Sequence, residues 1–174
     1  MSLGTYIRTR RGAAIFAVLL ALLARVAINA RWEFEAGFPE SRTWVLLTIP
    51  FRLLEHTQYF WLEAALMLGV AVLVMGLTRN FTARAALPAW IALFAVDALV
   101  IVVTGAIAVI GGNRIIAAEA LPIPPASWGV IAVDMTSVLL RNAFSIGIAA
   151  VGAWVVSFIH LRMKPEPSPI DSAG

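Results

Sequence analysis

The stretch FAVDALVIVVTGAIAVIGG, residues 94–112, is almost entirely apolar and contains one acidic residue, Asp97. At about 1.5 Å of rise per residue, an α-helix needs roughly 20 such residues to cross the hydrocarbon core of a bilayer. With the apolar residues before it, the stretch predicts a transmembrane helix over residues 86–110. A carboxylate at the centre of such a helix costs about 2.5–3.5 kcal/mol on insertion scales. Asp97 is therefore expected to face the interior of a helix bundle.

The composition of the whole chain also indicates a membrane protein. Of its 174 residues, 61% are hydrophobic and only 13% are charged, whereas soluble domains carry roughly 25% charged residues. The absence of cysteine excludes disulfides and thiolate metal sites. The formal charge of +3 does not indicate nucleic-acid binding, because the arginines stand singly at the ends of apolar runs. The expected partner is the lipid bilayer, with no nucleic acid.

Three further stretches have the length and composition of membrane spans. The first is predicted to remain in the mature chain, because Arg25 interrupts its apolar run and no small-residue cleavage site follows. The tail at 165–174 is rich in proline and polar residues, which predicts disorder. The sequence thus predicts an all-α polytopic membrane protein with a single domain over 1–164 and four transmembrane helices at about 12–30, 59–77, 86–110 and 142–161.

Two shorter apolar segments, 44–51 and 127–140, fall below the length of a span. They are predicted to be interfacial or re-entrant segments on the outer side, or helical extensions above the membrane. Arginine and lysine residues near the span ends number seven on one side and four on the other. The positive-inside rule then places both termini in the cytoplasm. The expected location is a bacterial cytoplasmic membrane.

Several charged residues lie in or beside the outer halves of the spans, and we expect them to form a functional polar network. Arg25 and Glu63 have matching depth and opposite charge, which predicts an ion pair between them. Asp97 is predicted to lie deeper, near the midplane. It is expected either to reach Arg141 or to stay neutral and hydrogen-bonded within the bundle. The predicted network comprises Arg25, His56, Glu63, Asp97, Asp134 and Arg141.

Small residues on the third and fourth spans predict close helix packing. They recur at steps of three or four, which lets another helix approach closely. The pattern fits packing inside this bundle and docking of a helix from another subunit equally well. The residues concerned are Gly105, Ala108, Gly112, Ser145, Ala149 and Gly152.

No arrangement of residues in the sequence indicates catalysis, a bound cofactor or a metal site. Asp97 and Asp134 are predicted at different depths, which argues against two aspartates sharing a proton. His56 and His160 are predicted near opposite membrane faces, so they cannot jointly ligate one haem iron. A lone histidine with scattered carboxylates also lacks the clustered ligands of a metal site.

The sequence therefore favours a non-catalytic function. The leading expectation is a small integral membrane subunit or accessory protein that binds other membrane proteins, or a second copy of itself, in an assembly or stabilising role. The alternative is a small transporter or channel with an outward-facing polar vestibule and Asp97 as its deepest acid. An intramembrane enzyme ranks third. In a transporter the polar faces would line a solvated cavity, whereas in a subunit they would neutralise one another.

Overall fold

The computed structural model describes residues 3–36, 50–51, 53–55, 57, 59–118, 125 and 127–163 of the chain. Within these residues every regular element is a helix. Four helical stretches are long and apolar enough to cross a membrane, at Arg10–Arg31, Phe60–Thr78, Leu87–Gly112 and Trp128–Arg162. The predicted all-α fold with four transmembrane helices is confirmed.

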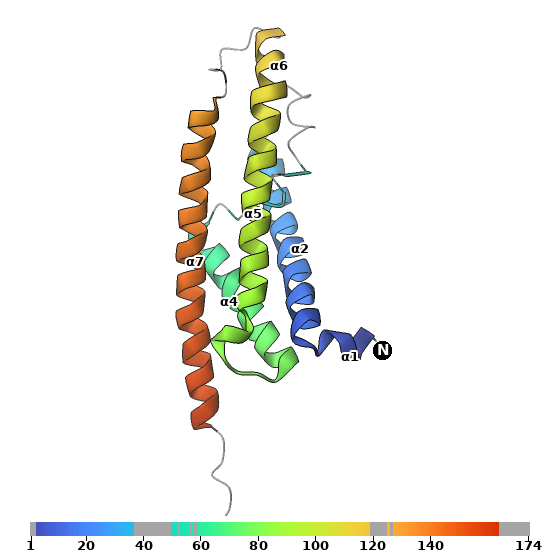
Figure 1. Ribbon diagram of the computed structural model, residues 1–174, viewed down its shortest axis with the longest axis vertical. Helices are drawn as coiled ribbons and strands as arrows, with labels where there is room; N and C mark the ends of the chain where they lie inside the picture. Colours follow the sequence, from blue (N-terminus) through green and yellow to red (C-terminus); the bar gives the residue numbers. More distant parts are fainter. Residues whose placement is uncertain are drawn as a thin grey trace, which may run out of the picture.

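The first half of the chain folds as two antiparallel spans (Figure 1). Helix α1 (Leu3–Ile7) lies across one end of the bundle, and α2 (Arg10–Ala36) rises from that end. Helix α4 (Phe60–Thr78) returns to the same end. It stops there because Arg79 adopts a left-handed conformation, with φ 52°, and the N–H groups of Arg79 and Asn80 bond back to carbonyls of the last turn. This Schellman motif pairs carbonyls that the helix end would otherwise leave unsatisfied.

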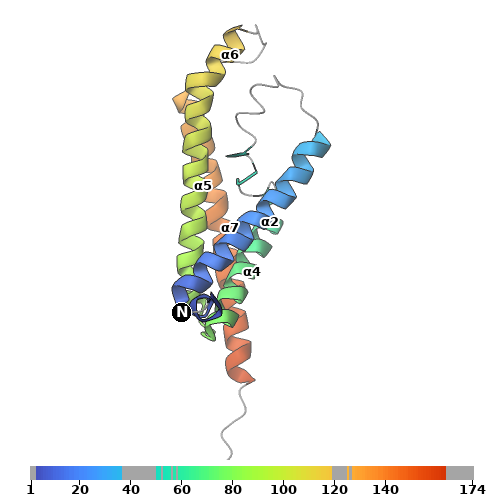
Figure 2. The same cartoon turned by 90° about the vertical axis from the view of Figure 1, so that its right-hand side faces the viewer.

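The second half of the chain adds two long helices that run side by side (Figures 1 and 2). The 3-10 turn η1 (Ala83–Ala85) leads into α5 (Leu87–Ile107). Helix α5 continues through the π-helical segment η2 (Ala108–Gly112) into α6 (Asn113–Ala118). Helix α7 (Trp128–Arg162) then runs back along α5. Figure 2 shows that α2 crosses the direction of α5 obliquely, which affects the depth at which its side chains meet those of α5.

Residues 128–140, predicted to be an interfacial or re-entrant segment or a helical extension, form the start of α7. Ser127 caps this helix, its side chain accepting a hydrogen bond from the N–H of Val130 at 3.3 Å. No proline follows before Arg162, so nothing interrupts the 35-residue helix. At about 1.5 Å per residue the helix is roughly 52 Å long, well beyond the roughly 30 Å of hydrocarbon. Of the predicted alternatives, the structure has the helical extension, because the segment is continuous with the fourth span.

Other predicted segments fall largely outside the described residues. Of the segment 44–51, the structure describes only 50–51, which are helical. The tail at 165–174 lies wholly outside the described residues.

The bundle has the order α2, α4, α7, α5, in which α2 and α7 each pack against both α4 and α5. Its core is rich in alanine, which lets the helices approach closely. The indole N–H of Trp90 on α5 donates to the carbonyl of Met67 on α4 at 2.9 Å, so the largest ring of the core has its polar atom satisfied. The core includes Ala13, Ala17, Ala21, Met67, Ala71, Val74, Met75, Ala86, Ala89, Trp90, Leu93, Ala149 and Ala153.

The outside of the four spans is covered by large apolar side chains. All four helices contribute, and many of these side chains are more than half exposed. Such faces suit a lipid bilayer, in which the hydrocarbon tails take the place of water. Among the exposed residues are Leu19, Leu23, Trp61, Ile91, Leu99, Val133, Phe144, Val151 and Trp154.

Candidate functional site

Arg25 of α2 is fully buried in the centre of the bundle and bonds to two other helices. Its Nη1 and Nη2 atoms donate to Oδ1 and Oδ2 of Asp97 on α5, at 2.7 and 3.1 Å. Its Nη2 atom also donates to Oε1 of Glu63 on α4 at 2.5 Å. The exposed fractions of Arg25, Glu63 and Asp97 are 0%, 0% and 1%. Charge-assisted hydrogen bonds therefore join α2, α4 and α5 at one point.

The two carboxylates receive further hydrogen bonds from neutral donors. The side-chain amide of Asn142 on α7 donates to Oδ2 of Asp97. The backbone N–H of Thr57 donates to Oε2 of Glu63 at 2.9 Å. Each of the four carboxylate oxygens thus accepts at least one hydrogen bond, which is what burial of these groups requires. We call Arg25, Glu63, Asp97 and Asn142 the ionic cluster.

Helical periodicity places these side chains toward one another. Asp97 lies on the stripe of α5 that also buries Trp90, Leu93 and Val100, at steps of three or four residues. Glu63 lies in the first turn of α4, where a carboxylate interacts favourably with the helix dipole. All four helices therefore contribute one member of the ionic cluster from their buried sides.

A second set of polar side chains holds the backbone just before α4. Nη2 of Arg141 donates to the carbonyl of Thr57 at 3.2 Å. The amide of Asn29 donates to the carbonyls of Leu53 and Glu55, at 3.3 and 2.9 Å. Non-helical backbone at membrane depth is tolerated where protein groups satisfy its hydrogen bonds. Arg141 is therefore linked to the ionic cluster through Thr57, whose carbonyl it bonds and whose N–H donates to Glu63.

The structure shows the expected pairing of Arg25 with Glu63 and corrects the expected depth of Asp97. Asp97 lies level with both residues, not below them, and its partner is Arg25 instead of Arg141. The predicted depth of Asp97 assumed that the depth of a residue in the membrane is proportional to its distance along its helix. Asp97 lies about 15 Å from the start of α5, and Arg25 about 22 Å from the start of α2. Because α2 is inclined to α5 (Figure 2), these two path lengths reach the same level.

The remaining residues of the predicted network are not brought into the cluster. Asp134 is exposed on α7, about 12 Å along the helix from Asn142. His56 lies outside the described residues.

Asn142 and Thr57 belong to the site but were not identified from the sequence. The predicted network includes Arg141, whereas the buried stripe of α7 runs through the next residue, Asn142, and on through Ser145, Ala149 and Ala153. The spacing of these small and polar residues, at steps of three and four, was the signal that could have identified Asn142. Thr57 bonds to Glu63 through its backbone, so its side-chain type carries no such signal.

Two of the predicted packing residues, Gly105 and Gly152, lie at helix contacts within this chain. A Cβ atom added to Gly105 would lie 2.6 Å from Cγ2 of Ile131 on α7, and one added to Gly152 would lie 3.0 Å from Cδ1 of Leu68 on α4. Gly112, Ser145 and Ala149 are buried as well. The side chain of Ala108 lies outside the described part of the structure.

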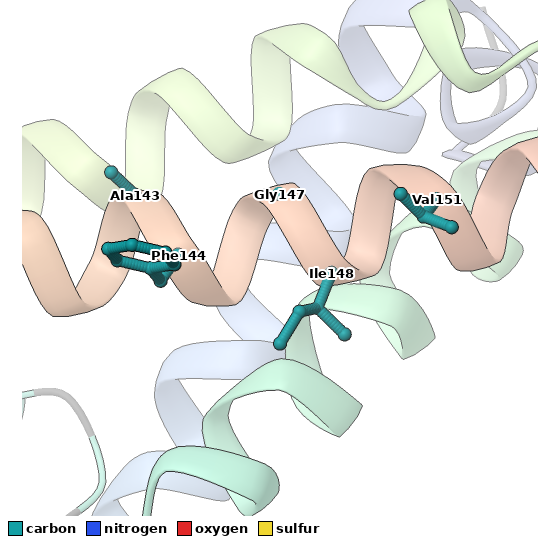
Figure 3. Close-up of a pocket in the computed structure, with 5 residues that line it drawn as sticks. All are labelled: Ala143, Phe144, Gly147, Ile148 and Val151. Carbon is teal, nitrogen blue, oxygen red and sulfur yellow. The ribbon is translucent and has the colours of Figure 1, made fainter.

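A shallow apolar hollow lies on α7, on a different face from the buried stripe (Figure 3). Phe144 and Val151 are exposed at its edges, and Gly147 has no atom within 4 Å of where a Cβ would lie. The hollow does not reach the ionic cluster. Its lining is Ala143, Phe144, Gly147, Ile148 and Val151.

The chemistry available to the ionic cluster is limited by its closure. Each of its charged groups is bonded to a group of opposite charge and shielded from solvent. Among the described residues, no group of three or more histidine, cysteine or carboxylate side chains could hold a metal ion. None of the family models, curated proteins or solved structures compared with the chain matches it. The arrangement is suited to fixing four helices relative to one another.

Proposed function

We propose that this protein is a small integral membrane subunit or accessory protein that binds other membrane proteins and has no catalytic role. The observation that carries the proposal is the closure of the ionic cluster, in which Arg25 forms ion pairs with both Glu63 and Asp97 and all three side chains are 0–1% exposed. A vestibule for a polar solute would leave some of these groups facing water. A closed cluster instead gives a rigid bundle whose outer faces are free to bind neighbours.

The hollow on α7 supports the choice of partner. Ala143 and Gly147 are four residues apart and exposed, an arrangement that lets a second transmembrane helix approach the backbone closely. Phe144 and Val151 beside them offer apolar surface to such a helix. A transmembrane helix of another protein, or of a second copy of this chain, is therefore the proposed ligand of this face.

The proposal includes the orientation of the bundle in the membrane. Exposed arginines gather at the end of the bundle where α1, η1 and the end of α7 lie. The positive-inside rule assigns that end to the cytoplasm of a bacterial inner membrane. The arginines are Arg8, Arg10, Arg11, Arg79, Arg84 and Arg162.

Intact-complex mass measurement on protein extracted in native-membrane nanodiscs tests the proposal. The expected result is a mass above that of one chain, with a membrane protein or a second copy retained. Gly147→Leu fills the hollow and should release the partner. Gly69→Leu is the matched control, because Gly69 is an exposed helical glycine on α4 that also has no atom within 4 Å of a Cβ. A lone wild-type monomer, or release by both variants alike, would overturn the proposal.

Transport is the second candidate, and one observation favours it. Ionisable residues inside membrane spans commonly mark pathways for ions or protons, and three meet here. In addition, Oδ1 of Asn142 and Oγ of Ser145 are buried without a hydrogen-bond partner among the described residues. If the cluster opens during transport, Asp97→Asn and Glu63→Gln should change ion or proton flux in reconstituted vesicles. Unchanged flux in both variants would exclude this role for the cluster.

A further inference from the structure

The corner between α1 and α2 is held in one conformation by several local contacts. The hydroxyl of Thr9 donates to the carbonyl of Tyr6 at 2.7 Å and accepts from the N–H of Gly12 at 3.1 Å. The backbone of Tyr6 passes so close to Gly12 that an added Cβ would lie 2.0 Å from the Tyr6 carbonyl oxygen. Glycine is therefore required at position 12 for α1 to lie across the end of the bundle, as Figures 1 and 2 show.

This corner gathers arginine side chains. Arg8, Arg10 and Arg11 are exposed within it. Nη2 of Arg10 donates to the backbone carbonyl of Arg84 at 3.0 Å, so the backbone of η1 at the exposed Arg84 lies beside Arg10. In the part of the chain that the structure describes, the acidic residues lie in the ionic cluster or toward the opposite end of the bundle. We call Arg8, Arg10, Arg11 and Arg84 the arginine corner.

An apolar column rises from the arginine corner along the outside of α2. Ile15, Leu19 and Leu23 follow Arg11 at steps of four residues, so they form a stripe that winds slowly around the outer side of the helix. The three apolar side chains are 51%, 55% and 64% exposed. The outer side of α2 thus presents a cation near the start of the span and apolar side chains immediately beyond it.

We propose that the arginine corner binds the phosphate headgroup of an anionic phospholipid whose acyl chains lie along Ile15, Leu19 and Leu23. The four positive charges attract an anionic phosphate, and guanidinium groups bind phosphate oxygens with directed hydrogen bonds. The apolar column selects a lipid over a free phosphate, because only a lipid carries hydrocarbon next to its phosphate. The site is independent of the partner-binding face on α7.

Native mass spectrometry tests this site on protein reconstituted with equal amounts of phosphatidylglycerol and phosphatidylcholine of the same acyl chains. The wild type should retain phosphatidylglycerol in preference. Arg11→Gln and Arg84→Gln should each lower that retention about fivefold, the effect of removing one basic residue near an anionic surface. Arg11→Lys should keep most of it. Arg114→Gln is the control, since it removes one exposed arginine at the opposite end of the bundle.

Three other results would contradict the proposal. Equal retention of both lipids by the wild type would overturn the preference for an anionic headgroup. An equal loss in Arg114→Gln would show a response to net charge, without a site at the corner. Soluble glycerol phosphate should fail to displace the lipid, because it has no acyl chains. Efficient displacement would show that the apolar column does not contribute to binding.

Discussion

Arg25 and Asp97 are 72 residues apart in the sequence, yet the guanidinium of the first donates to both carboxylate oxygens of the second. The geometry is bidentate, and both side chains are buried. A buried ion pair need not add net stability, because removing both charges from water is costly. Its clearer effect is on specificity, since either partner left alone in the bundle would be an uncompensated charge. The pair therefore fixes how α2 and α5 are placed relative to each other.

Arg25→Gln should be among the most destabilising single substitutions in the chain. It leaves the carboxylates of Glu63 and Asp97 together in the core with only neutral donors. Removing one partner of a buried pair costs about 3–5 kcal/mol, and this residue serves two partners. Unfolding by dodecyl sulfate in mixed micelles, followed by circular dichroism, measures the free energy. Arg114→Gln, at an exposed position, should change it by less than about 0.5 kcal/mol.

The effects of Arg25→Gln and Glu63→Gln should be non-additive. Once Arg25 is neutral, loss of the Glu63 charge removes a repulsion from Asp97 instead of breaking an ion pair. The double variant should therefore be more stable than the sum of the two single effects predicts, by about 0.5–3 kcal/mol. The four proteins form a double-mutant cycle in the same unfolding assay. Strict additivity would show that the Arg25–Glu63 contact contributes nothing to the folded state.

Asn142→Asp should destabilise the protein more than Asn142→Ala. The aspartate places a third carboxylate beside Asp97, where the amide of Asn142 now donates a hydrogen bond, and like charges at short range repel. Alanine removes that single hydrogen bond, worth about 1.5–3 kcal/mol when the acceptor is charged. Thermal unfolding in one detergent ranks the variants. The reverse order would mean that Asn142 does not point at Asp97.

Gly105→Ala should destabilise the α5–α7 contact, because its Cβ would lie 2.6 Å from Cγ2 of Ile131. Overpacking of this kind costs about 1–3 kcal/mol. Ile131→Ala in the same chain should restore part of the loss by making room. Gly76→Ala, on α4, is a control with no atom within 4 Å of its added Cβ. No rescue by Ile131→Ala would place the packing partner of Gly105 elsewhere.

The four spans and the inward position of Asp97 could be predicted because both follow from the properties of hydrocarbon. Length and hydropathy identify a span, and the cost of a charge in lipid turns Asp97 toward other helices. The partner of Asp97 could not be predicted, because depth depends on the inclination of α2, which the sequence does not state. Hydropathy also separated 127–140 from the fourth span, because Asp134 and Arg141 are polar. Polar side chains do not interrupt a helix, so both residues lie within the continuous helix α7. Hydropathy reports exposure to lipid, whereas helix continuity depends on breakers.

Closure of the ionic cluster to water in the folded protein can be measured directly with an introduced thiol. The chain contains no cysteine, so one introduced thiol can be followed without background. Ser145 is fully buried and lies one turn from Asn142. The measurement is the rate at which a charged, membrane-impermeant thiol reagent modifies Ser145→Cys in nanodiscs, with the exposed Asp134→Cys as reference. Ser145→Cys should stay unmodified until the protein is denatured, while Asp134→Cys should react promptly. Modification of both at similar rates would contradict this closure and indicate an open polar vestibule.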